Sequence, residues 1–426
     1  MKKFFALLLA LCLAMTMVAS VASAEGGKVY YLNFKPEADA AWQELAKTYT
    51  EKTGVQVTVV TAASGTYSQT LTAEMDKSSA APTLFQCGNQ GAINSYGDYC
   101  YPLDGTAIMD QMTTDAFNLK GEDGQTLSIG YCYEAFGIIV NKALLEKAGH
   151  SIDEITDFAS LKAVADDIHA RAEELGFDAF SSAGLEGSSS WRFSGHLANM
   201  PLYYEFRDDG VTAQPATITG AYLENFKNIW DLYTTDSATT GAALATATGD
   251  ESEAEFGEGK AAFYQNGTWE YSNLTGTFGM DPADLAMIPI YCGVDGEEKA
   301  GLCAGTENCW AINNESSEGD IQATIDFLVW VVTSDEGTTM LAEEFGPCPF
   351  KDAKDPENVF FQDANKYTAD GKYVVTWAFN WTPAVDDWRA AVVDALTQYS
   401  AGTGDWSAVE TAFVQGWATL YAKDNA

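Results

Sequence analysis

The chain has 426 residues, of which 61 are acidic and 23 are Lys or Arg, so its formal net charge is −38. A field of this sign repels nucleic acids, anionic lipids and polyanionic ligands. The charges are spread along the chain rather than gathered in a tail, which is typical of a solvated acidic surface.

The first 24 residues have the pattern of a cleaved secretory signal. Lys2 and Lys3 precede an apolar stretch, 4–18, that is too short to cross a bilayer as an ordinary helix. Small residues at 22–24 then match an A-x-A cleavage site, so we expect cleavage before Glu25. Removing 24 of the 426 residues leaves 402, which is too long for one core and predicts two domains outside the membrane.

Two other fates of this N-terminal segment stay open. It could remain as an uncleaved anchor, or the chain could be lipidated at Cys12. Leu11 stands where a lipid-attachment motif has a small residue, and cleavage there would leave an apolar tether, so we favour ordinary cleavage.

Strand and helix patterns alternate at the start of the mature chain. Apolar residues recur at helical spacing between the β-rich runs, and Gly54 is the expected C-cap of the first helix. The predicted elements are a strand at 29–34, a helix at 40–52, a strand at 55–60, a helix at 67–77 and a strand at 82–86. This order predicts a parallel sheet with helices on its faces, with ligands beyond the carboxyl ends of the strands.

A second α/β unit is predicted from about residue 136. Asp157 is the expected N-cap of its second helix. The predicted elements are a strand at 136–140, helices at 141–149, 158–175 and 221–233, a strand at 285–290 and a helix at 321–333, with loops at 181–190 and 234–252.

Seven cysteines remain after the expected cleavage, so at least one is unpaired. None forms a C-x-x-C pair, and no pairing can be deduced from the sequence. Disulfides and buried free thiols both stay open.

Catalytic motifs have little support. There are three histidines, and no metalloprotease, nucleophile-elbow, dinucleotide or Walker pattern. With so many acidic residues, carboxylate pairs arise by chance and do not indicate a glycosidase. We expect no enzyme, no metal and no cofactor.

Aromatic residues are the informative feature: 11 Trp, 20 Tyr and 22 Phe make up 12% of the chain. Sugar rings have apolar faces and polar edges, so a sugar site needs aromatic plates beside hydrogen-bonding groups. The pairs that combine both are Trp191 with Arg192, Trp269 with Glu270, and Asn380 with Trp381.

Four segments, in this order, resemble family 1 extracellular solute-binding proteins, the carbohydrate-type receptors of ABC importers related to maltose-binding proteins. They are 137–149 (GIIVNKALLEKAG), 256–269 (FGEGKAAFYQNGTW), 309–313 (CWAIN) and 323–337 (ATIDFLVWVVTSDEG). The resemblance implies a two-lobed α/β fold of the periplasmic-binding-protein type, each lobe a mainly parallel sheet flanked by helices, with three hinge strands crossing between the lobes. It also implies a monomer that delivers its ligand to membrane permease subunits without a reaction.

By position, the resemblance places the lobes and the hinge. The N-lobe is expected at 25–134 plus 293–344 and the C-lobe at 135–292 plus 345–426. The crossings are expected near 134–136, 289–293 and 343–347.

The resemblance also implies the ligand contacts. Trp269 closes a motif whose Trp stacks on a sugar ring in the family. Among the C-terminal aromatics, Trp388 is the best positional match. The full set of expected ligand-binding residues is Phe34, Lys35, Gln86, Asn89, Glu134, Trp191, Arg192, Trp269, Trp377, Trp381 and Trp388. Gln86 stands where maltose-type proteins have an aromatic, which argues against a malto-oligosaccharide.

We therefore expect an extracytoplasmic receptor for a sugar or oligosaccharide. The alternatives are a receptor for a polyamine or another small cation, which the acidic charge would suit, a secreted glycoside hydrolase, and a surface adhesion protein without a small ligand.

Overall fold

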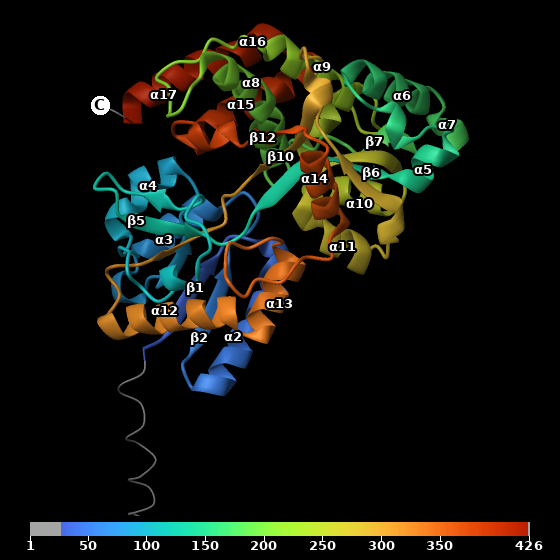
Figure 1. The fold of residues 1–426 in the computed structure, drawn as a ribbon. Coiled ribbons are helices and arrows are strands. Elements are labelled where there is room, and N and C mark those ends of the chain that lie inside the picture. Colours follow the sequence, from blue (N-terminus) through green and yellow to red (C-terminus); the bar gives the residue numbers. More distant parts are fainter. Residues whose placement is uncertain (1–26, 425–426) are drawn as a thin grey trace, which may run out of the picture.

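The computed structural model describes residues 27–424, which form two lobes (Figure 1). The predicted signal sequence and Cys12 lie outside the described residues. In Figure 1 the first lobe, mostly blue and cyan with orange α12 and α13, lies below the second lobe, which is green, yellow and red. No helix within 27–424 is long and apolar enough to cross a membrane.

The first lobe is built on a six-stranded sheet with the order β2-β1-β3-β11-β5-β4. Strands β1, β2 and β3 are parallel, as predicted, and β11, β5 and β4 continue the sheet in antiparallel pairs. Its strands are β1 (Val29–Asn33), β2 (Val57–Thr61), β3 (Leu84–Gln86), β4 (Leu119–Lys120), β5 (Thr126–Gly130) and β11 (Cys309–Ile312). Its helices are α2 (Asp39–Thr53), α3 (Tyr67–Met75), α4 (Gln90–Tyr96), α12 (Glu318–Thr333) and α13 (Asp335–Glu344).

The second lobe has a sheet with the order β12-β10-β6-β8-β7, and β9 also pairs with β6. Its strands are β6 (Glu134–Asn141), β7 (Asp178–Phe180), β8 (Ala261–Gly267), β9 (Leu285–Ile288), β10 (Ala300–Gly305) and β12 (Tyr373–Thr376). Its helices are α5 (Lys142–Lys147), α6 (Phe158–Ala170), α7 (Ala172–Leu175), a π-helical turn at Arg192–Leu197, α8 (Ala198–Asp209), α9 (Leu223–Thr235), α10 (Gly249–Gly257), α11 (Tyr271–Gly276), α14 (Val359–Ala369), α15 (Val385–Ser400), α16 (Trp406–Glu410) and α17 (Gly416–Asp424).

The two-lobed α/β fold is confirmed, but the sheets are mixed rather than mainly parallel. Strand β6 pairs antiparallel with β8, β9 and β10, and the parallel pairs of this sheet lie at its two edges. The long apolar strand β6 is buried along its whole length, as expected for a central strand covered on both faces.

The spacing of apolar residues and the capping residues in the sequence predicted the positions of most helices. Helix α2 buries Trp42, Leu45, Ala46 and Tyr49 on one face, as its spacing predicts, and ends at Gly54 with φ 78°. Asp157 caps α6 by accepting from the Ser160 backbone N–H at 2.8 Å. The single helix expected at 158–175 is divided into α6 and α7.

Three segments connect the lobes. The first, between β5 and β6, lies near its predicted position. The second runs through 306–308, not 289–293, because β9 and β10 still pair with β6. The third lies after residue 350, beyond 343–347, because the carbonyls of Pro347 and Pro349 accept hydrogen bonds from Tyr133 and Thr113 of the first lobe.

The second crossing also corrects one part of the expected lobe division. Residues 293–305 were expected in the N-lobe, but β10 pairs with β6 and β12 in the second sheet. The physical reason is that β10 is a central strand of that sheet, so the chain leaves it only at Gly305.

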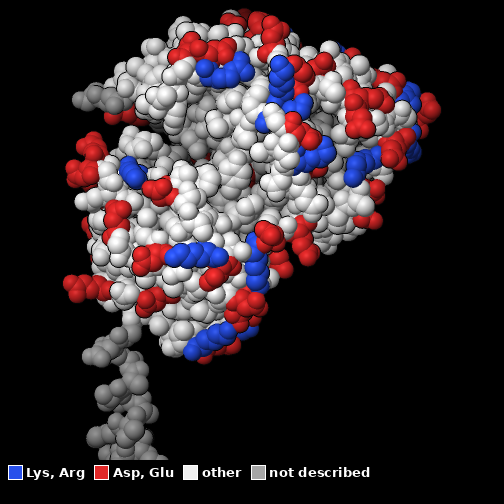
Figure 2. All heavy atoms as spheres, viewed as in Figure 1, with Lys and Arg blue, Asp and Glu red and all other residues white. Residues whose placement is uncertain are grey.

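Acidic side chains are scattered over the visible face of both lobes (Figure 2). On that face they do not gather into one patch. This agrees with the sequence, in which the charges are spread along the chain. The same view shows a hollow where the lobes meet, bordered mostly by uncharged residues.

Candidate functional site

The site lies between the lobes, where Lys35 of the first lobe meets Glu134 at the start of β6. Lys35 follows β1, and its Nζ lies 2.8 Å from Glu134 Oε1 and 3.4 Å from Glu37 Oε1. Only 7% of Lys35 and 3% of Glu134 are exposed. Asn308, in the second crossing, donates to Glu134 Oε2 at 2.5 Å, so both carboxylate oxygens are occupied.

Burial and charge oppose each other in this ion pair. Burial lowers the pKa of Lys35, but the fields of Glu134 and Glu37 outweigh it and hold the pKa above its ordinary value. Burial raises the pKa of Glu134, and the Lys35 ammonium offsets only part of that rise. These charges favour the ammonium form of Lys35, and the ammonium in turn opposes the effect of burial on Glu134.

An aromatic wall stands on the second-lobe side of Lys35. The ammonium lies 4.7 Å from the centre of the Trp269 ring. Trp269 follows β8, and its ring covers Gly267 so closely that a Cβ there would lie 2.1 Å from a ring carbon. Trp191 lies 6.0 Å from Trp269 between ring centres. Glycine at 267 therefore lets the indole lie flat on the end of the strand.

His196 forms the back of this wall as a neutral ring. It is stacked on Phe136 at 4.0 Å and lies 5.4 Å from Trp269. Burial, and then the positive charges of Arg389, Arg192 and Lys35, lower the pKa of His196 well below its ordinary value. The imidazole therefore acts as an aromatic plate rather than as a charge.

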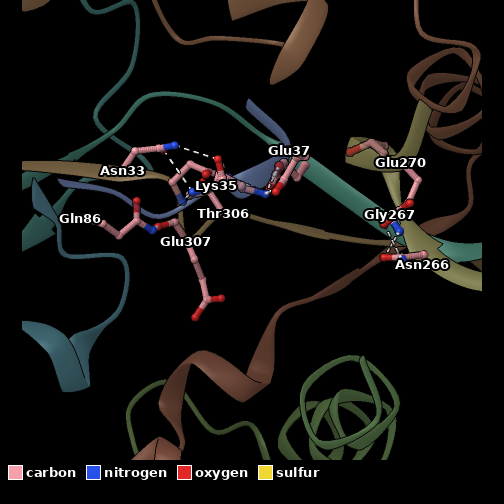
Figure 3. A network of polar contacts seen from close by, with 12 residues as sticks. Asn33, Lys35, Glu37, Gln86, Asn266, Gly267, Glu270, Thr306 and Glu307 are labelled. Carbon is pink, nitrogen blue, oxygen red and sulfur yellow. Dashed lines mark hydrogen bonds and ion pairs between the residues drawn. The ribbon is translucent and has the colours of Figure 1, made fainter. Parts of the chain in front are cut away.

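Amide side chains from both lobes bind the second crossing. Figure 3 shows the first of them, Gln86, beside Glu307. Gln86, at the end of β3, donates to the Glu307 carbonyl, and Asn89 donates to Glu307 Oε1 at 3.2 Å. Asn380 of the second lobe donates to the Thr306 carbonyl at 3.2 Å.

The lobes touch each other beyond the hinge. Ser64 Oγ donates to the Ser188 carbonyl at 3.4 Å, and helix α4 lies against the 3-10 turn Ala378–Trp381. These contacts join residues of opposite lobes outside the hinge, so the structure represents an arrangement in which the lobes touch each other.

Two carboxyl groups, Glu253 and Glu270, form a further pair beside Trp269. Burial and then the field of Glu253 raise the pKa of Glu270 well above its ordinary value, and burial also raises the pKa of Glu253. Asn266 donates to Glu270 Oε1 at 2.7 Å. Burial and the field of Glu253 therefore favour the protonated form of Glu270.

Several predicted site residues come together here. Lys35 contacts both Glu134 and Trp269, Trp191 packs against Trp269, and the Phe34 ring centre lies 5.4 Å from the Lys35 ammonium. Gln86 and Asn89 join them through Glu307.

Two of the C-terminal tryptophans, Trp377 and Trp381, lie in different surroundings. Trp377 packs against Phe136 at 5.5 Å and covers Gly305, next to the second crossing. Trp381 is partly exposed and stacks on Phe206 at 5.8 Å.

Two predicted ligand contacts are corrected. Trp388 is 0% exposed, lies among Phe413 and Trp417, and donates its N–H to the Phe413 carbonyl, so it belongs to the helical core. Arg192 is 2% exposed, and its guanidinium is used by backbone carbonyls such as that of Gln265 at 3.0 Å. Neither side chain has a free face for a ligand.

Glu37, His196 and the crossing residues 306–308 are at the site but were not among the residues predicted for it. Glu37 was detectable, because it stands two residues after Lys35 in the same loop. The crossing residues were not, because short polar segments carry no periodic signal. Among residues 27–424, no cluster of three or more His, Cys, Asp or Glu could hold a metal ion, and the seven cysteines are free thiols.

The fold and this interlobe site define a two-lobed solute-binding receptor. The profile described as bacterial extracellular solute-binding protein matches residues 44–369. The chain therefore belongs to that family. No curated protein matches it.

Solved structures agree on the fold. The complex of the solute-binding protein RafE with raffinose has a TM-score of 0.72 at 13% identity, over 94% of this chain and 100% of the other. The receptor AcbH, described with a preference for β-D-galactopyranose, gives 0.71 at 15% identity, over 93% and 100%. The receptor GacH of Streptomyces glaucescens, described in complex with acarbose, gives 0.68 at 17% identity, over 94% and 99%.

Proposed function

We propose that this protein captures a sugar or short oligosaccharide between its lobes and delivers it to the permease of an ABC importer, without catalysis. The carrying observation is the Trp269 ring at the interlobe site: its position is fixed by Gly267, and the ammonium of the Lys35–Glu134 ion pair lies 4.7 Å from its centre. Aromatic faces suit the apolar side of a sugar ring, and the charged groups suit its hydroxyls. The similar receptors described with raffinose, galactopyranose and acarbose support this ligand class.

The proposed mechanism is ligand-stabilised closure. A ligand that contacts both lobes favours the closed arrangement by its differential affinity for the two states. The proposed contacts are Phe34, Lys35, Gln86, Asn89 and Glu134 from the first lobe and the hinge. From the second lobe they are Trp191, Trp269, Trp377 and Trp381.

Calorimetry on residues 25–426 tests the proposal with a panel of mono- and oligosaccharides. We expect one saccharide to bind with a Kd on the order of 1 μM. Trp269→Ala should weaken it at least about tenfold, because a stacked ring contributes more than 1.4 kcal/mol. Spermidine is measured alongside the saccharides, because it should bind if the protein is a receptor for small cations.

Trp330→Ala is the matched control. Trp330 is partly buried on α12, where it packs on Tyr49 of the neighbouring helix α2 with 5.1 Å between ring centres. Its loss should leave sugar affinity unchanged. Tight binding of spermidine but of no saccharide would overturn the proposal.

A further inference from the structure

Gln86 and Asn380 approach the second crossing from opposite lobes in the same way. Each uses its side-chain NH2 group to donate to a backbone carbonyl, that of Glu307 for Gln86 and that of Thr306 for Asn380. The two carbonyls are consecutive in the chain. In Figure 3 the Gln86 side chain extends toward this crossing segment.

The other end of each amide has no hydrogen-bond partner among the described residues. Gln86 Oε1 and Asn380 Oδ1 are both buried and unpaired. Neither amide can be turned over to relieve this, because the turn would place a carbonyl oxygen against the carbonyl it now donates to. A buried acceptor left unpaired destabilises the state in which it is buried.

The position of Gln86 is fixed by close packing. A Cβ on Gly88 would lie 2.1 Å from the Glu307 carbonyl oxygen and 2.9 Å from Gln86 Nε2. The loop after β3 therefore lies directly on the crossing segment, and the Gln86 oxygen cannot swing away while this packing holds. On the other side, the Asn380 backbone N–H donates to the Trp377 carbonyl at 3.2 Å.

Both oxygens lie where the lobes meet, since α4, which follows Gln86, contacts the turn that contains Asn380. Opening the lobes admits water to these acceptors and satisfies them. Closing the lobes without a ligand removes the water and leaves both unpaired. A ligand that brings hydroxyl donors removes this disadvantage of the closed state.

We propose that Gln86 and Asn380 are an acceptor pair that makes lobe closure depend on a ligand with hydroxyl donors, and that selects hydroxyl-rich sugars. This inference rests on the proposed function. Glu307, whose carboxylate is held by Asn89, adds a third acceptor beside the pair. A ligand without hydroxyl donors that face Gln86 and Asn380 should bind without closing the lobes.

The test compares two kinds of substitution at each position. Gln86→Leu and Asn380→Leu remove both the acceptor and the donor. Gln86→Glu and Asn380→Asp keep an acceptor oxygen but lose the donor to the crossing segment. Saccharide affinity is measured by calorimetry, the ligand-free radius of gyration by small-angle scattering, and the fold by circular dichroism.

We expect each Leu variant to bind the saccharide about tenfold more weakly, as for a lost hydrogen bond. The Leu variants also leave the Glu307 or Thr306 carbonyl without its donor, so the ligand-free radius of gyration is compared for the acidic variants. We expect these to be more open than the wild type without ligand, because closing the lobes would bury a carboxylate that has no donor. The acidic variants should bind better than the Leu variants. If the amides only clamp the hinge, the acidic variants should instead bind as poorly or worse.

The outcomes separate this inference from the proposed function. Suppose that the wild type binds a saccharide, that both Leu variants bind it with unchanged affinity, and that both acidic variants are as compact as the wild type without ligand. This result would overturn the acceptor pair and leave the function standing. Absence of any saccharide binding by the wild type would overturn the function. The ligand-free scattering would then still decide whether the two amides oppose closure.

Discussion

The ammonium of Lys35 and the indole of Trp269 belong to different lobes, yet they lie 4.7 Å apart in a cation–π contact. The same ammonium forms the ion pair with Glu134. One buried lysine therefore joins the first lobe, the hinge and the aromatic wall of the second lobe.

Lys35→Met should destabilise the protein by about 3 kcal/mol, because it leaves the buried Glu134 carboxylate without its cation. Urea unfolding measures this. Adding Glu134→Gln should restore part of the loss, since the uncompensated charge is then gone. A loss below about 1 kcal/mol for the single variant would show that the ion pair is not needed.

Gly267→Ala should weaken saccharide binding without removing any ligand-contacting group. The new methyl would lie 2.1 Å from the Trp269 ring, so the ring must move off the strand end. We expect about a tenfold loss of affinity by calorimetry, as for loss of the stacked ring itself. Gly276→Ala is the control, because a Cβ there meets nothing within 4 Å. If both variants bind the saccharide with equal affinity, saccharide binding does not depend on the position of the Trp269 ring over Gly267.

Glu270→Gln should stabilise the protein at neutral pH and have little effect at pH 4. The raised pKa of Glu270 means that the folded state binds its proton more tightly than the unfolded chain does. The stability this group contributes is present below its unfolded pKa of 4.5 and is lost as the pH rises through the folded value. Thermal melting from pH 4 to 8 measures the effect.

Glu224→Gln, at an exposed position of α9, is the control for general charge reduction. The same pH-dependent gain in both variants would assign the effect to net charge rather than to the Glu253–Glu270 pair.

Trp388→Phe should reduce stability and leave sugar affinity unchanged. The smaller ring leaves a cavity among Phe413 and Trp417 and leaves the Phe413 carbonyl without its donor, at a cost of about 2 kcal/mol. Urea unfolding and calorimetry measure the two effects. If the saccharide affinity falls while the free energy of unfolding is unchanged, Trp388 contacts the ligand after all.

Periodic and capping signals predicted the local elements well. Asp157 and Gly54 mark helix ends by their own chemistry, and the β-α-β-α-β order predicted the parallel half of the first sheet. The direction of β10 and β11 could not be predicted in this way. These strands are short and pair with partners far along the chain, such as β6 and β3.

The residues of the candidate site could likewise be predicted only in part. Lys35 follows one predicted strand and Gln86 is the last residue of another, so both lie at the strand ends where a ligand is expected. The local sequence around Trp388 does not show that it is a core residue. Its packing against Phe413 and Trp417, which lie later in the chain, separates it from Trp377 beside the hinge. Burial of that kind depends on tertiary contacts, which a single sequence does not display.

A crystal structure with the tightest-binding saccharide of the panel tests the central claim most directly. We predict a sugar ring lying parallel to the Trp269 indole between the lobes, with hydroxyls bonded to groups of both. A saccharide bound elsewhere on the molecule, or held by one lobe with Trp269 uncovered, would contradict the account.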